Sequence, residues 1–163
     1  MHDMSALIHN MNTLINNQKT EIATLTRNQN TKVHFTASLS RRLTLAGSQV
    51  LTFDHVITNV GGGYNASTGR FTCPVDGYYL FEMHILGQAD KFTNFQLWLN
   101  QQRVVVTETD DLHDYQSASN SAILQLQRGD SVRVVSGAGH SSYADGYVTH
   151  AYTTFTGSLL SLT

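Results

Sequence analysis

Short alternating segments separated by turn signals are the feature that most constrains the fold of this chain. From about Val33 onward, turns rich in glycine, asparagine and aspartate recur roughly every ten residues, a spacing that favours strands over helices. Between these turns, residues 131–135 and 154–160 alternate between apolar and polar side chains, and residues 78–86 form a longer, largely apolar run. The pattern predicts an all-β domain, a sandwich or jelly roll, over residues 31–163.

A different period governs residues 1–30, which contain neither glycine nor proline. Their seam residues follow one another at alternating steps of four and three: Met4, Ile8, Met11, Ile15, Gln18, Ile22, Leu25 and Gln29. A helix of this length is marginal alone, so we expect residues 1–30 to be a heptad-containing helical leader that orders by bundling with copies of itself. The alternative is a disordered leader whose spacing is accidental.

Composition excludes several classes of function. The chain has 163 residues and a formal net charge of −2, so nothing indicates a nucleic acid or an anionic membrane surface as partner. A single cysteine excludes an intrachain disulfide framework, and no apolar run approaches the ~20 residues that span a bilayer. Since the sequence contains no nucleophile elbow, phosphate loop or zinc motif, we expect the protein not to be an enzyme.

Aromatic residues and glycines are specifically spaced in the middle of the chain. The positions are Phe53, Asn59, Tyr64, Phe71, Gly77, Tyr79 and Phe81. This spacing resembles that of the globular C1q domain family, in which the next position, here Met83, would be Phe or Tyr. The closing segment 154–160 also matches, and the resemblance covers about residues 33–163. It implies a C1q/TNF-like jelly-roll sandwich, here preceded by a short N-terminal coiled-coil helix.

The resemblance also implies a function. C1q-like domains assemble as trimers, are mostly extracellular and act as recognition heads. Without a collagen repeat, this chain is similar to the short, free-standing C1q-domain proteins of invertebrates, which are lectin-like pattern-recognition molecules of innate immunity. We therefore expect a secreted homotrimer that binds microbial or host glycans, because linking weak sites multiplies apparent affinity by ~10²–10⁴. Two alternatives remain open: an extracellular fluid or matrix protein that binds calcium or heavy metals, and a trimeric signalling ligand for a protein receptor.

The candidate sugar-binding residues lie in one loop. They are His140, Ser142, Tyr143, Asp145 and Tyr147. Aromatic faces beside small hydroxyls and a carboxylate suit sugar rings, which offer C–H faces and hydroxyl edges. Alternatively, these tyrosines pack between subunits.

The densest acidic cluster supplies candidate calcium ligands: Glu108, Asp110, Asp111 and Asp114. Calcium prefers oxygen ligands from a loop, and the resemblance implies a calcium ion near the trimer apex in many family members. The position that best corresponds to a usual family ligand is Gln116, so the match is not exact. The alternative is a solvated acidic loop.

Three further features have plain structural explanations. The tripeptide Arg-Gly-Asp at 128–130 matches an integrin-binding sequence, but a hairpin turn already requires Gly-Asp there. The N-glycosylation sequence at 65–67 coincides with an expected turn. Trp98 is out of phase with Phe95 and Leu97, so alternation sends it to the opposite face of its strand, where a subunit contact or a ligand would cover it.

Overall fold

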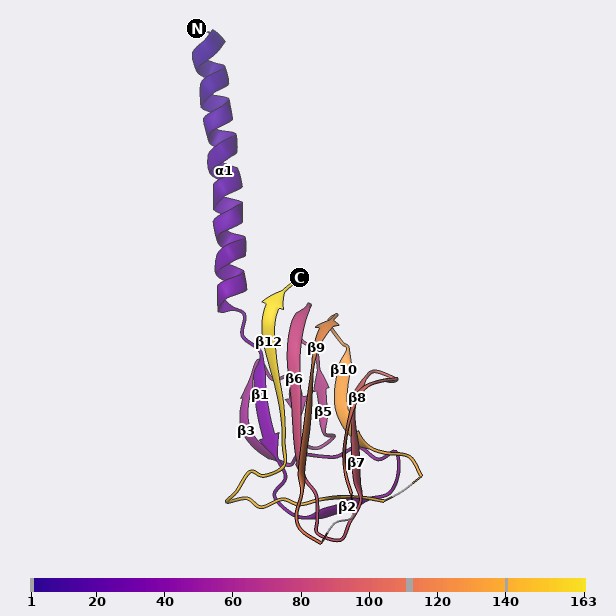
Figure 1. Cartoon of the computed structure of the whole chain (residues 1–163). Helices are drawn as coiled ribbons and strands as arrows, with labels where there is room; N and C mark the ends of the chain where they lie inside the picture. Colours follow the sequence, from indigo (N-terminus) through magenta and orange to yellow (C-terminus); the bar gives the residue numbers. More distant parts are fainter. Residues whose placement is uncertain (1, 111–112, 140) are drawn as a thin grey trace. The chain divides into compact units, whose positions relative to one another are not determined.

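The computed structural model describes residues 2–110, 113–139 and 141–163, and for these it gives one helix and twelve strands (Figure 1). The chain divides after residue 32 into two units. In the described part of the chain, no helix is long and apolar enough to cross a membrane.

The first unit is the helix α1 (His2–Asn30). The expected helix is confirmed, and its apolar side chains, from Met4 to Leu25, are exposed to solvent in the single chain. An unpartnered apolar stripe of this kind is typical of a helix that packs against another helix.

The second unit is a sandwich of two antiparallel five-stranded sheets (Figure 1). In order across the first sheet, the strands are β3 (His55–Val60), β1 (His34–Ser38), β12 (Thr154–Leu162), β6 (Gly77–Leu86) and β9 (Ser117–Leu126). In order across the second sheet, they are β4 (Tyr64–Asn65), β5 (Arg70–Thr72), β10 (Ser131–Ser136), β7 (Thr93–Leu99) and β8 (Gln102–Thr109). A short pair, β11 (Ser142–Ala144) with β2 (Leu43–Leu45), completes the described strands. The expected all-β jelly roll is confirmed.

Strand β6 shows why this sequence forms a sheet. Tyr79, Phe81, Met83 and Ile85 are fully buried and alternate with side chains that point away from the core. This period of two suits a strand with one face on the core. Met83 occupies the position where an aromatic ring was expected from the family pattern, and it is as completely buried as its neighbours.

Aromatic rings fill the space between the two sheets. Phe35 of β1 stacks on Phe71 of β5 with ring centroids 5.3 Å apart, and meets Phe155 edge-on at 4.9 Å. These rings fit because Gly157 leaves room for them: a Cβ atom there would lie 2.8 Å from Cε1 of Phe81. Buried rings of about 150–250 Å² each contribute much of the hydrophobic stabilisation of such a core.

The spaced motif also closes a loop. The side-chain amide of Asn59 donates to the carbonyl oxygen of Tyr64 at 2.9 Å and accepts from its backbone N–H at 3.3 Å. The hydroxyl of Tyr64 in turn donates to the carbonyl oxygen of Phe53 at 3.0 Å. Three of the motif positions are therefore joined directly, which explains their fixed spacing physically.

Candidate functional site

Asp145 anchors the loop in which we expected sugar-binding residues. Its side chain is fully buried, and Oδ2 accepts from Nη2 of Arg42 at 2.8 Å, while Oδ1 accepts from the N–H of Gly146 at 2.9 Å. The hydrogen bond from Arg42 to this carboxylate raises the pKa of the guanidinium further above its ordinary value. Both oxygens of Asp145 are thus used within the chain, and the side chain does not reach a ligand in solvent.

Ser142 has a similar internal role. It is fully buried, and its hydroxyl donates to the carbonyl oxygen of Asn94 at 2.8 Å, which holds β11 against β7. Tyr143 is half-buried; its carbonyl oxygen accepts from the hydroxyl of Thr93 at 2.7 Å, and Nζ of Lys91 lies 5.3 Å from the centre of its ring. His140 lies outside the described residues. Ser142 and Asp145 were expected to contact a ligand directly. Both are buried, and their hydrogen bonds instead hold the loop in place.

A cluster of exposed rings stands on that positioned base. We call residues 146–152 the aromatic loop. Tyr147 and Tyr152, each 46% exposed, meet edge-on with centroids 6.2 Å apart, and the exposed ring of His150 stacks on Tyr152 at 5.5 Å. Tyr147 was among the expected residues, His150 was interpreted from the sequence as a packing histidine beside a strand, and Tyr152 was missed. The available signal was the rise in aromatic and histidine content just before the buried Thr153.

Thr153 closes the base of the aromatic loop. Its hydroxyl donates to the carbonyl oxygen of Asp145 at 2.5 Å and accepts from the N–H of Leu86 at 3.0 Å. The loop therefore leaves and re-enters the sandwich at one buried point. Fixing both ends of the loop reduces the conformational entropy that is lost when a ligand binds to the rings.

The described residues of the expected calcium set, Glu108, Asp110 and Asp114, are exposed and are not gathered into a cage. Glu108 accepts from the side-chain amide of Asn94 at 2.7 Å, and Asp110 and Asp114 face solvent. Asp111 lies outside the described residues. Over residues 2–110, 113–139 and 141–163 there is no group of three or more His, Cys, Asp or Glu side chains that could hold a metal ion.

The Arg-Gly-Asp sequence forms a turn. Asp130 accepts from the side-chain amide of Asn100 at 2.9 Å through Oδ1 and from the N–H of Gln127 at 2.8 Å through Oδ2. Gly129 has a φ of 95°, a conformation that favours glycine. The carboxylate that an integrin would need is therefore engaged in stabilising the turn.

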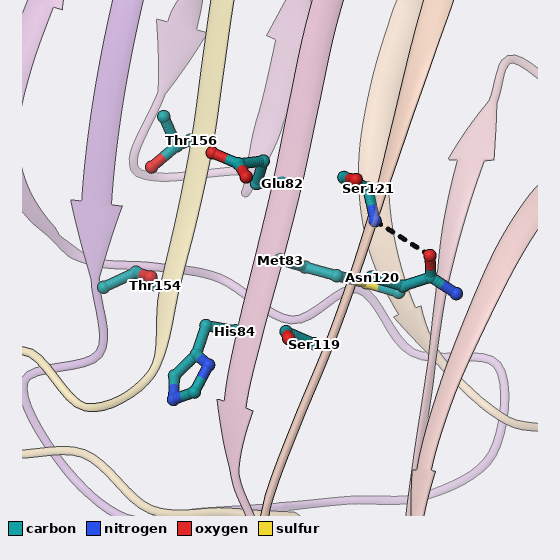
Figure 2. A pocket seen from close by; sticks show the side chains of 8 residues that line it. All are labelled: Glu82, Met83, His84, Ser119, Asn120, Ser121, Thr154 and Thr156. Carbon is teal, nitrogen blue, oxygen red and sulfur yellow. Dashed lines mark hydrogen bonds between the residues drawn. The ribbon is translucent and has the colours of Figure 1, made fainter.

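The outward face of the first sheet has a polar half and an apolar half. The polar half contains a hollow of about 430 Å³, where Figure 2 shows Glu82 and His84 of β6 between the threonines of β12 and the serines of β9. The apolar half exposes Val60, Tyr78, Ile123 and Leu160, of which Ile123 is 62% exposed. The two halves were not distinguished from the sequence, because their residues come from four strands.

Comparisons with known proteins add to this geometry. The family model described as "C1q domain" matches residues 34–160. The heavy metal-binding protein HIP of Mytilus edulis is 34% identical over 133 residues, which are 78% of this chain and 60% of that protein. Caprin-2 of Danio rerio is 37% identical over 116 residues, which are 69% of this chain and 12% of that protein. The chain thus spans less than two thirds of the length of either relative.

Solved structures resemble the sandwich. The globular domain of zebrafish complement 1qA protein has a TM-score of 0.67 at 22% identity and covers 81% of this chain and 100% of that one. The Eiger TNF of S. frugiperda has a TM-score of 0.62 at 16% identity, with 81% and 93% covered. At these identities the likeness shows a shared fold.

Proposed function

This chain belongs to the C1q domain family, and from that premise we propose that it is an extracellular recognition protein, not an enzyme, which acts as a homotrimer and binds glycans. The observation that carries the proposal is the aromatic loop, where three exposed rings stand on a base that is closed by buried hydrogen bonds. Aromatic faces are the usual partners of the C–H faces of sugars, and a fixed loop presents them at low entropic cost.

Exposed apolar surface supports assembly of several copies. The apolar half of the first sheet and the stripe along α1 are both open to solvent in the single chain. Monomeric proteins rarely expose contiguous apolar patches larger than a few hundred Å². Each copy of this chain carries the same two surfaces, so they can be covered by one another when copies assemble. Copies of this chain are therefore the partners we propose, and a trimer would present three aromatic loops, so that weak sites act together.

A glycan array tests the binding. We expect the wild-type protein to bind a subset of glycans and the double variant Tyr147→Ala/Tyr152→Ala to lose about tenfold or more in apparent affinity, since aromatic contacts contribute about 0.5–1.5 kcal/mol each. The matched control is Val148→Ala, which removes an exposed apolar side chain from the same loop without removing a ring. Equal binding by the two variants, or no binding by the wild type, would contradict the proposal.

We also propose that glycan binding depends on calcium, and a separate experiment tests this. The array is run with calcium and with EDTA, and Asp110 and Asp114 are replaced by Asn together. We expect EDTA and the double variant to weaken binding to the same extent if the acidic residues hold the ion. Binding that is unchanged in EDTA would leave a calcium-independent lectin and would remove these residues from the site.

Metal binding is a second candidate function. A relative that is 34% identical to this chain over 133 residues is named a heavy metal-binding protein. In this chain, three histidines share the outward face of the first sheet: Nδ1 of His34 lies 2.7 Å from the hydroxyl of Ser158, Nδ1 of His55 lies 3.1 Å from that of Ser38, and His84 borders the hollow. Calorimetry with zinc and copper separates the two functions, because tight metal uptake without glycan affinity would favour this one.

A further inference from the structure

Two arginines and a tryptophan lie side by side on the outward face of the second sheet. Arg133 of β10 is the register partner of Arg70 of β5 on one side and of Trp98 of β7 on the other. Their sequence neighbours Phe71 and Val132 are buried in the core, so alternation directs these three side chains outward. With Ser48, Val50 and Val135, the three side chains line a hollow of about 260 Å³.

Among the described residues, no carboxylate forms an ion pair with the two arginines of this hollow. Within the described ranges, the ion pairs closer than 4.0 Å join Arg41 to Asp54, Arg42 to Asp145 and His113 to Asp90, so neither Arg70 nor Arg133 takes part in one. Like charges directly opposite each other on neighbouring strands destabilise a sheet. Burial and the charge of Arg70 both lower the pKa of Arg133. An anion between the two guanidinium groups would relieve this repulsion.

Trp98 holds one of these guanidinium groups in place. Its indole N–H donates to Oε1 of Gln96 at 3.1 Å, which fixes the ring, and Cζ of Arg133 lies 5.8 Å from the ring centre. A cation over an aromatic face is attracted to it. The planar guanidinium is thereby presented with its donors arranged for a carboxylate or sulfate, which it recognises with two parallel hydrogen bonds.

The same hollow offers an apolar surface beside the charges. Val50, Val135 and the indole of Trp98 border it, and all three are partly or fully buried within the chain. Sites that bind sugars combine apolar or aromatic walls with a few directed polar groups. A nucleic acid would instead need an extended basic surface, whereas this chain has a net charge of −2.

We propose that Arg70, Arg133 and Trp98 form a binding site for the sulfate or carboxylate groups of an acidic polysaccharide. The site faces away from the first sheet, so assembly through that sheet leaves it open. The inference rests on the proposed recognition of glycans, but it uses different residues from the aromatic loop and can fail independently of it.

Calorimetry with the full chain and a heparin octasaccharide tests the site. We expect Arg133→Gln to weaken binding about tenfold and Arg70→Gln to weaken it to a similar extent, as expected for loss of one charge-assisted contact. The matched control is Arg128→Gln, which removes the same charge from an exposed turn and should change affinity less than twofold. Thermal unfolding of each variant checks that the fold is intact. We expect it to be, because neither Arg133→Gln nor Arg70→Gln breaks an ion pair.

Further arms identify the recognised group and its source. Desulfated heparin and hyaluronate separate sulfate from carboxylate recognition, and binding of either acidic group that is lost in Arg133→Gln supports the site. Equal affinity of Arg133→Gln and Arg128→Gln for heparin, or no binding of heparin, desulfated heparin or hyaluronate by the wild type, overturns it. Single-stranded DNA bound as tightly, with the same loss in Arg133→Gln, overturns the assignment to a polysaccharide. The variant Tyr147→Ala/Tyr152→Ala should retain heparin binding, so failure of the aromatic loop and failure of this site are distinguishable.

Discussion

Replacing Asp145 with asparagine tests whether this residue anchors a loop or contacts a ligand. The change keeps the size of the side chain, but it removes the charge and leaves a single oxygen for two donors, the N–H of Gly146 at 2.9 Å and Nη2 of Arg42 at 2.8 Å. The amide must then place either an oxygen without charge or an NH₂ group against the guanidinium. The buried end of the pair therefore loses a charge-assisted hydrogen bond.

The expected destabilisation is moderate. A hydrogen bond to a charged group contributes about 1.5–3 kcal/mol, and because the side chain of Arg42 is 50% exposed, solvent screening reduces this value. We expect a loss of about 2 kcal/mol in the free energy of unfolding, which for a unit of this size lowers Tm by about 6–10 °C. Urea unfolding and calorimetry at one fixed protein concentration measure it, since assembly would make stability depend on concentration.

An exposed aspartate of the same chain provides the control for this substitution. Asp114→Asn, measured in EDTA, makes the same charge change at an exposed position and should shift Tm by less than about 2 °C. If Asp145→Asn left the stability unchanged while abolishing glycan binding, Asp145 would be a ligand residue as the sequence suggested, and our account of it as an anchor would be wrong.

Three other perturbations have defined outcomes. Phe81→Ala should destabilise the sandwich by about 3–5 kcal/mol in urea unfolding, because it removes a buried ring that lies 5.3 Å from the ring of Phe71 and leaves a cavity there. A change below about 1 kcal/mol would argue against the packed core. Burial raises the pKa of the Cys73 thiol and of the Tyr64 hydroxyl, so the unfolded chain loses these protons first and the urea midpoint should fall as pH rises above about 8.5–10; a constant midpoint to pH 11 would contradict this. Ile123→Glu/Leu160→Glu should shift light scattering toward a single subunit with an intact β-sheet spectrum, whereas Val148→Glu should not; an unchanged mass would exclude the apolar half of the first sheet as the contact between copies.

The sequence was sufficient to predict the main strands and the core, because burial on a strand is encoded locally. The largely apolar run at residues 78–86 predicted β6 within one residue, and the spacing from Phe53 to Phe81 predicted several of the rings that fill the sandwich. The period of the leader likewise gave α1. Each of these signals lies within a short stretch of chain, so no knowledge of distant contacts was needed.

The tertiary structure decided the sites. Glu108 and Asp110 are close in sequence and both exposed, yet no metal-holding cluster forms among the described residues. The Glu108 carboxylate accepts from Asn94, and Asp110 is exposed just after the end of β8. Asp145 looked like a ligand residue until Arg42, 103 positions away, was seen to pair with it.

Residues far apart in the sequence can also form a site that the sequence does not predict, as Arg70, Trp98 and Arg133 do. They lie in separate strands, and antiparallel register alone makes them neighbours. Alternation along a strand fixes which face a side chain occupies, but which residues meet on that face depends on strand order and register. Those are set by packing of the whole core, and a single segment of sequence does not contain them.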